Sequence, residues 1–388
     1  MIKLIFFLTF LLIISITVPF YFYYPFDLEE ASISSKSKLA KAYFVNASSL
    51  KDDAKCLDGT PPVYFHLQGH STGFRKWLIF FEGGGWCTFR EECISRSQSY
   101  FGSSKDFPPY IHLDSEFYHY FSKEEGLNPL MHNWNKVYIH YCDGGSFSGN
   151  AVSKYKIENE EKVIYYKGKN ILKAIFDDLM QNRGLTGAID IVLSGGSAGG
   201  LSVFLHLDYL VSILTPYNEG AKIVGLPISG YFPDKEGPFY FSSRIKWIFD
   251  NMNVMESMNH ECLRHHNEKE YKCLFAPNIL PFIQAPIFVI QSQYDSWQQS
   301  FIYALKSSLG FKNYGQRLMR KLLFTLNEDK NKKGGWIDSC SHHLFMFNEI
   351  KIDGLAQSEA FYSWYTGKGE KIYLQNENYP CHWCCNNY

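Results

Sequence analysis

Short apolar runs alternate along the chain with longer segments in which apolar residues recur every three or four positions. The runs are four to six residues long and rich in β-branched and aromatic residues, which is typical of strands buried in a sheet. The longer segments, around Ile171–Met180 and Leu201–Leu214, have the spacing of helices that bury one face. Strands that alternate with helices predict an α/β domain with a mostly parallel sheet and helices on both of its faces. The predicted strands are Trp77–Phe81, Lys136–Tyr141, Ile189–Leu193 and Pro286–Ile290.

The N-terminal segment differs from the rest in being almost continuously apolar from residue 4 to residue 24, directly after Lys3. This length lies between the ~7–15 residues of a cleaved targeting segment and the ~20 that span a bilayer. We therefore expect residues 1–25 to be a signal peptide or an uncleaved signal anchor that attaches the protein to a membrane through residues 4–24. Either way the body of the protein leaves the cytosol.

Residues 26–55 are rich in Ser, Lys and Asp and are predicted to be a polar stalk or linker. The remainder, 56–388, is predicted to be one globular domain. Asn46 begins the sequon Asn-Ala-Ser and is a candidate glycosylation site in the linker.

Composition narrows the range of partners. The chain has 38 basic and 39 acidic residues, for a net charge of -1, and no dense basic run, so nucleic acid is not an expected partner. The 10 cysteines favour disulfides in an oxidising compartment. Cys87 with Cys93, and Cys262 with Cys273, are close enough in sequence to pair, although connectivity as a whole does not follow from spacing. The cluster Cys381–Cys385 has no second cluster to complete a zinc site, so no metal is expected.

A candidate nucleophile follows the predicted strand Ile189–Leu193. The sequence Gly195-Gly-Ser-Ala-Gly199 places Ser197 between this strand and a helix, as in a nucleophile elbow. Glycines two residues before and after the serine suit such a turn, because a Cβ there would collide. The alternative is an ordinary glycine-rich turn in which Ser197 only caps the helix.

A serine nucleophile needs a base and an acid, and for this turn the expected chain order is Ser, acid, His. Asp295 follows the predicted strand Pro286–Ile290 and is the first candidate acid, with Asp338 and Asp143 as rivals. A turn or cap is the alternative role for Asp295. The candidate bases are adjacent, His342 and His343, near Cys340, which could pin their loop. Less favoured histidines are His260, His265, His266 and His382.

A glycine-rich loop directly after an early strand could supply the second donor of an oxyanion hole. Glu82-Gly-Gly-Gly-Trp-Cys87 follows Trp77–Phe81 in this way. A plain turn is the alternative. Glycines would let a backbone N–H approach a substrate oxygen closely.

Together these motifs resemble those of the pectin acetylesterase/Notum family. The matching segments stand in order over about Cys56 to Cys385: Glu82–Cys87, Tyr141–Gly149, Ser194–Gly200, Tyr294–Trp297 and Ser339–His343. The resemblance implies a secreted, disulfide-stabilised α/β-hydrolase-like fold and carboxylic ester hydrolysis by a serine triad.

Carried over by motif, the resemblance assigns the nucleophile to Ser197, the acid to Asp295 and the base to His343. The oxyanion hole would use the backbone N–H groups of Gly85 or Trp86 and of Ala198. The family pattern often has one histidine where this chain has two, so His342 stays an alternative. Asp143 is interpreted as a structural residue that holds a nearby loop.

The family divides by substrate. Some members resemble polysaccharide deacetylases and others remove a long acyl chain from a secreted protein. We expect acetyl-ester hydrolysis of a polysaccharide such as pectin without a cofactor. A Notum-like lipid deacylase is the alternative, and a catalytically silent binding module is an alternative of another class. A deep apolar cavity lined by aromatics near Tyr231, Phe239–Phe241 and Trp247–Phe249 would suit the lipid, but such residues are more often core. The oligomeric state does not follow from the sequence.

Overall fold

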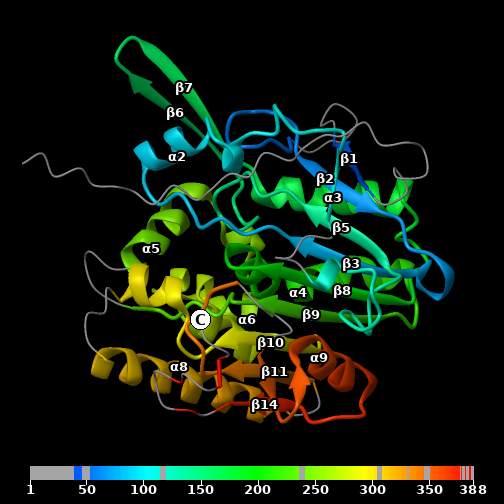
Figure 1. Cartoon of the computed structure of the whole chain (residues 1–388). Helices are drawn as coiled ribbons and strands as arrows, with labels where there is room; N and C mark the ends of the chain where they lie inside the picture. The colour runs from blue at the N-terminus through cyan, green and yellow to red at the C-terminus, as the bar shows by residue number, and fades with distance from the viewer. Residues whose placement is uncertain are drawn as a thin grey trace, which may run out of the picture. The chain divides into compact units, whose positions relative to one another are not determined.

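A ten-stranded sheet forms the centre of the computed structural model, in the order β14-β11-β10-β9-β8-β3-β5-β2-β1-β4 (Figure 1). The structure describes residues 39–45, 53–113, 119–235, 241–303, 308–329, 332–344, 350–375, 377, 381, 384 and 385. The contacts of these residues fall within one unit, Lys38–Tyr388. The predicted targeting segment and Asn46 lie outside the described residues.

The strands from β14 to β5 in this order run parallel to their neighbours, and the remaining three pair antiparallel at one edge. Their bounds are β1 Ala40–Phe44, β2 Val63–Leu67, β3 Lys76–Phe81, β4 Tyr110–Ile111, β5 Asn135–Ile139, β8 Asp190–Gly196, β9 Lys222–Ile228, β10 Ile287–Ser292, β11 Lys333–Asp338 and β14 Ile372–Leu374. Two hairpins lie outside this sheet: β6 Ala151–Ile157 with β7 Glu160–Tyr166, and β12 Lys351–Ile352 with β13 Leu355–Ala356.

The helices cover both faces of the sheet, unequally. Their bounds are α2 Arg90–Arg96, α3 Gly168–Asn182, α4 Ala198–Leu214, α5 Phe241–Met252, α6 His260–His265, α7 Ala276–Ile279, α8 Ser308–Glu328 and α9 Gln357–Thr366. Short 3₁₀ turns are η2 Ser71–Gly73, η3 Tyr100–Gly102, η4 His119–Phe121, η5 Thr215–Tyr217, η6 Met255–Ser257, η7 Glu270–Leu274 and η8 Leu280–Phe282, and η9 Gln298–Ile302 is a π-helical turn.

Alternation along the strands divides the core into two layers. In β3, Trp77, Ile79 and Phe81 point to the layer that contains α3, α4, α5, α7 and α8. Leu78 and Phe80 point to the other, which contains α9 and part of the segment 113–134. Because successive side chains of a strand face opposite sides, each central strand needs apolar residues on both. The predicted α/β-hydrolase-like class, with a mostly parallel sheet and helices on both faces, is confirmed.

The first strand lies inside the segment that we expected to be a linker. β1 pairs antiparallel with β2, and Ala40 is fully buried, so the sheet begins before the predicted boundary at residue 56. β1 lies near the edge of the sheet and exposes part of its length. It therefore does not need a long apolar run, and its sequence, Ala-Lys-Ala-Tyr-Phe, has none.

Five disulfides use all ten cysteines. The two short pairings expected from spacing, Cys87–Cys93 and Cys262–Cys273, are present. Cys340 pairs with Cys385, 45 residues away, and therefore ties the loop after β11 to the C-terminal segment. The others are Cys56–Cys142 and Cys381–Cys384.

Helix α4 packs against β8 and β9 and lies in the core. Within the described part of the chain, the segment Ala198–Tyr217 is the one helix long and apolar enough to cross a membrane. Its burial in the fold accounts for that apolar character.

The close packing of α4 against the sheet gives a first prediction. A Cβ added at Gly199 would lie 2.1 Å from the Phe81 backbone oxygen. Gly199→Ala should therefore destabilise the protein by more than about 3 kcal/mol, although alanine is the better helix former. Urea unfolding measures the change.

The matched control is Gly126→Ala, whose added Cβ would meet no atom within 4 Å. Its free energy of unfolding should stay within about 1 kcal/mol of the wild-type value. Equal stability of the Gly199→Ala and Gly126→Ala proteins would contradict the prediction.

Candidate active site

Ser197 occupies the sharp turn between β8 and α4. Its backbone has φ 56° and ψ -121°, in the region that side chains rarely adopt. A Cβ at Gly195 would lie 2.4 Å from the Gly199 oxygen, so the turn requires glycine there. The Ser197 N–H donates to the Ile228 oxygen of β9 at 2.9 Å, which fixes the turn against the sheet. The side chain is thereby held at the carboxyl edge of the parallel strands, as the sequence predicted.

The imidazole of His343 lies between Ser197 and Asp295. Its Nε2 is 2.8 Å from Ser197 Oγ, and its Nδ1 is 2.8 Å from Asp295 Oδ2. A carboxylate can only accept, so Nδ1 carries the proton and Nε2 is free to accept from the serine hydroxyl. This is the protonation state that a general base requires.

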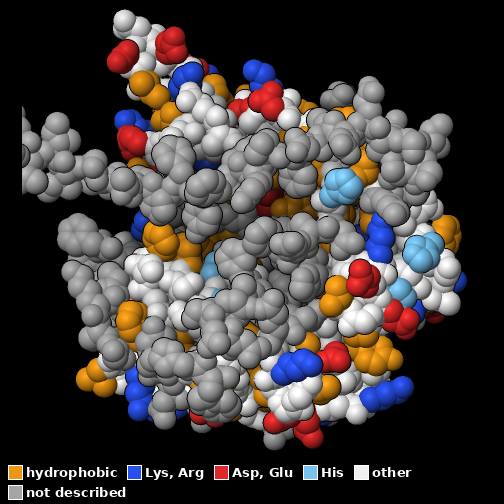
Figure 2. Space-filling model, in the orientation of Figure 1, with side chains coloured by type: hydrophobic (Ala, Val, Ile, Leu, Met, Phe, Trp, Pro, Cys, Tyr) orange, Lys and Arg blue, Asp and Glu red, His pale blue; other side chains and the backbone are white. Residues whose placement is uncertain are grey.

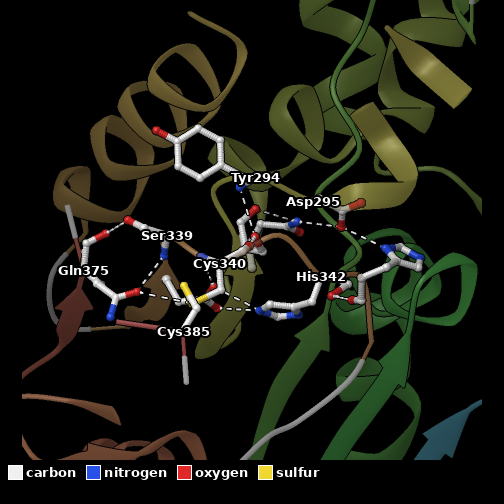
Figure 3. Close-up of polar contacts among 12 residues, drawn as sticks. Tyr294, Asp295, Ser339, Cys340, His342, Gln375 and Cys385 are labelled. Carbon is white, nitrogen blue, oxygen red and sulfur yellow. Dashed lines mark hydrogen bonds and ion pairs between the residues drawn. A yellow bond between two sulfur atoms is a disulfide. The ribbon is translucent and has the colours of Figure 1, made fainter. Parts of the chain in front are cut away.

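Asp295 is completely buried in the turn that follows β10. It accepts from Gln291 Nε2 at 3.1 Å, in addition to His343 (Figure 3). It also accepts from the Gln298 backbone N–H at 2.9 Å. These donors replace water around a buried carboxylate. They also fix the direction in which Asp295 faces the imidazole.

The rival acid and base form a separate pair. His342 Nε2 lies 3.0 and 3.1 Å from the two oxygens of Asp338, a fully buried residue at the end of β11 (Figure 3). Burial alone would lower the pKa of His342, but the charge and hydrogen bond of Asp338, with the charge of Asp295, raise it above its ordinary value. His342 makes no hydrogen bond to Ser197 or to any other described residue of the nucleophile turn.

The remaining candidates lie elsewhere. Asp143 accepts backbone N–H groups of Gly145 and Phe147, and burial raises its pKa to about 6 against the effect of these bonds and of Arg96. It therefore holds its own loop. His260 and His265 are in α6 and His266 follows it, whereas His382 lies outside the described residues.

The glycine loop after β3 approaches the serine closely. A Cβ at Gly83 would lie 3.0 Å from Ser197 Cβ. Arg96 donates to the Gly84 oxygen at 2.9 Å, so the N–H of Gly85, on the opposite side of the same trans peptide, points the other way. Among the described residues, no hydrogen bond uses the backbone N–H of Gly85, Trp86 or Ala198. The expected oxyanion donors are thus not committed to another described group.

Two supports of this loop were not anticipated from the sequence. Glu82 is buried and accepts from His140 Nδ1 at 2.6 Å, from the Tyr141 backbone and from Tyr100. The only sign of the Glu82–His140 contact in the sequence is that both residues are polar and directly follow apolar strands. On the other side of the loop, Trp86 Nε1 donates to Ser146 Oγ at 2.8 Å.

Aromatic side chains pack beside the imidazole. The ring centroid of Trp86 is 4.9 Å from Phe232, 5.4 Å from Phe241 and 5.9 Å from Trp297. Trp297 also stacks on His343, with centroids 5.9 Å apart. These rings are in direct contact with one another. We call Trp86, Phe232, Phe241 and Trp297 the aromatic cluster.

Comparison with known proteins identifies the family of this chain. The pectinacetylesterase family model matches residues 33–386. The chain belongs to this family. It is 30% identical to pectin acetylesterase 5 of Arabidopsis thaliana over 94% of this chain and 86% of that protein. It is 33% identical to pectin acetylesterase 7 of the same plant over 65% of this chain and 61% of that relative.

Relatives of this chain also include proteins with another named activity. Human palmitoleoyl-protein carboxylesterase NOTUM is 28% identical over 85% of this chain and 69% of its own length. The resemblance inferred from the motifs is therefore confirmed, and so is its division between two kinds of ester.

Metal ligation is not favoured in this pectinacetylesterase-family fold. Two groups of closely spaced ligand types occur among the described residues, Cys262, His266 and Cys273, and Cys340, Cys384 and Cys385. Every cysteine in them is in a disulfide, so their thiolates are not available as ligands.

On the face shown in Figure 2, the described Lys and Arg side chains are interspersed with Asp and Glu.

A buried histidine in α4 makes stability depend on pH. His206 of α4 is 1% exposed and donates from Nε2 to the Ser146 oxygen at 2.8 Å. Burial lowers its pKa to about 4, although the bond to Ser146 opposes this. The unfolded chain takes up the proton near pH 6.5 and the folded chain only near 4. The stabilising contribution is therefore complete above pH 6.5 and is lost as the pH falls toward 4.

His206→Gln should remove this pH dependence, because glutamine can keep a donor to Ser146 but does not titrate. Between pH 7.5 and pH 5.0 the variant should lose about 2 kcal/mol less stability than the wild type, as measured by urea unfolding. Asp143, whose pKa is raised, changes the stability with pH in the opposite direction. It does so in both proteins, so its contribution cancels when their pH dependences are compared.

The exposed His70 provides the control. His70→Gln should follow the wild-type pH dependence, and a His206→Gln protein that also follows it would refute the prediction.

Proposed function

We propose that this protein is a secreted serine carboxylesterase that removes O-acetyl groups from a polysaccharide such as pectin. The observation that carries the proposal is the single imidazole, His343, hydrogen-bonded to both Ser197 and Asp295 at 2.8 Å. The relatives described above are named as esterases, which agrees with the proposal. A catalytically silent binding module would not need an imidazole that is hydrogen-bonded to both a serine and a carboxylate.

The proposed reaction is acyl transfer in two steps. His343 Nε2 takes the proton of Ser197 as Oγ attacks the ester carbonyl, and Asp295 stabilises the imidazolium that forms. The N–H groups of Ala198 and of Gly85 or Trp86 bind the tetrahedral oxygen, aided by the N-terminus of α4. The imidazolium then protonates the leaving alcohol. Water repeats the attack, which releases acetate and restores Ser197.

The aromatic cluster supports a short acyl group. Its rings contact one another at 4.9–6.1 Å, so they leave no space among themselves for a long acyl chain. Behind Trp86 the described residues leave a hollow about the size of one water molecule. A palmitoleoyl chain would require several of these rings to move, whereas acetyl would not.

An exposed aromatic face beside the site supports a sugar substrate. Phe301 is 64% exposed and stacks on Trp297, with ring centroids 5.1 Å apart, and Trp297 in turn stacks on His343. Sugar rings present flat faces of C–H groups that pack well on aromatic rings, and exposed apolar surface at a site often binds ligand.

Secretion is part of the proposal. Five disulfides require an oxidising compartment, which agrees with the apolar targeting segment expected at residues 1–25. Whether that segment is cleaved or anchors the protein is decided by N-terminal sequencing of the exported protein.

The test is acetate release from acetylated pectin and acetylated xylan, with p-nitrophenyl acetate and octanoate as small esters. We expect acetate release from at least one polymer, faster turnover of the acetate than of the octanoate ester, and loss of more than about 10⁴-fold in kcat on Ser197→Ala. Preference for octanoate would favour the lipid deacylase. Absence of turnover with all four substrates would favour a binding module.

The exposed aromatic face gives a further prediction. Phe301→Ala should raise KM for the acetylated polymer about fivefold and lower the ratio of polymer to p-nitrophenyl acetate specificity by a similar factor. Phe324→Ala removes an equally exposed ring from α8 and is the control. A specificity ratio equal in the two variants would exclude Phe301 as a contact for the polymer.

A further inference from the structure

The loop between β11 and His343 has no regular secondary structure, yet it must place one imidazole accurately between two partners. His343 makes both of its ring contacts at 2.8 Å. An error of about 1 Å in the position of a reacting group can cost about 10²-fold in rate. Something must therefore hold this loop.

Two contacts hold this loop near His343: Ser229 Oγ donates to the His343 backbone oxygen, and the ring of the adjacent histidine is bonded to a carboxylate. His342 and His343 are consecutive, and their rings point to different carboxylates, Asp338 and Asp295. Asp338 is fully buried and is itself fixed, since its backbone oxygen accepts from the Gln293 N–H at 2.8 Å. A bond from His342 to Asp338 thus ties the loop to the rigid end of β11.

Other contacts act on the same loop. Asp338 Oδ1 also accepts from the Cys340 N–H at 2.9 Å, and Cys340 is in a disulfide with Cys385 (Figure 3). The His342 oxygen accepts from the Ser296 N–H at 3.1 Å, next to Asp295. One residue, His342, therefore links the end of β11 through its ring with the turn that carries Asp295 through its backbone.

We infer that His342, through its bond to Asp338, is a positioning residue that holds the His343 imidazole in register with Ser197 and Asp295. This inference rests on the proposed function, because it assigns a role within that reaction. His342 does not touch the reacting atoms. Its contribution is to keep the loop in the one conformation in which Nε2 of His343 faces the serine.

The same pair sets the charge near the site. The charge of Asp338, with that of Asp295, favours the protonated form of His342 and opposes the effect of burial on its pKa. In its protonated form His342 would balance a buried carboxylate close to the reacting imidazole. Replacing it with a neutral residue would leave Asp338 uncompensated, and the added negative potential would favour the protonated, inactive form of the base.

The experiment compares His342→Ala, which removes the bond, with His342→Gln, whose side-chain amide can still donate to Asp338. Using p-nitrophenyl acetate, we expect His342→Ala to lower kcat about 30-fold and to change KM by less than about threefold. His342→Gln should recover at least tenfold of this loss. Exposed His112→Ala is the control and should keep the wild-type kcat.

The dependence of kcat/KM on pH provides a readout that a purely structural role would not move. In His342→Gln, its fall on the acid side should begin at higher pH than in the wild type. In the double variant with Asp338→Asn, which removes the uncompensated charge, this fall should return toward the wild-type position. Thermal unfolding of each variant shows whether it is folded.

A folded His342→Ala protein with kcat within twofold of wild type would overturn the inference, as would equal losses in the Ala and Gln variants. An acid-side fall that does not move in His342→Gln would also overturn it. These outcomes are distinct from failure of the proposed function, in which the wild-type protein itself would turn over no ester. If His342→Ala does not fold, the kcat and pH profile of His342→Gln decide the question.

Discussion

The site depends on a backbone contact that only glycine permits. β8 and α4 meet at Ser197 because Gly195 faces the Gly199 oxygen and Gly199 faces the Phe81 oxygen with no side chain between them. This closeness forces Ser197 into a positive φ and directs its side chain away from the sheet. It also places the first N–H groups of α4 beside Oγ, where developing negative charge would be stabilised.

The parallel sheet explains how residues far apart in sequence converge on that turn. The glycine loop follows β3, Ser197 follows β8, Asp295 follows β10 and His343 follows β11, so all lie at one edge of the sheet. The strand register aligns the ends of neighbouring strands, because Phe81 is paired with Gly195, and Ser292 with Asp338. Ser197, Asp295 and His343 are hydrogen-bonded to each other there, which makes this edge rigid.

Much of this was predictable, for physical reasons that also show where prediction stops. Buried parallel strands are continuous apolar runs, so β3, β5, β8 and β10 were recognised from sequence, whereas β1, close to the sheet edge and partly exposed, was not. The order of Ser197, Asp295 and the histidine doublet followed from topology. Which histidine faces Ser197 depends on loop conformation and could be assigned only by resemblance. Long-range disulfides such as Cys340–Cys385, and the packing of Trp86 against Phe232, depend on tertiary contacts that no local pattern encodes.

The disulfide between Cys340 and Cys385 has a consequence for biosynthesis. Ser197, Asp295 and His343 are all synthesised before residue 385, but the loop that carries the imidazole lacks its covalent tether until then. Assembly of the site is therefore completed after synthesis of this last segment and after thiol oxidation.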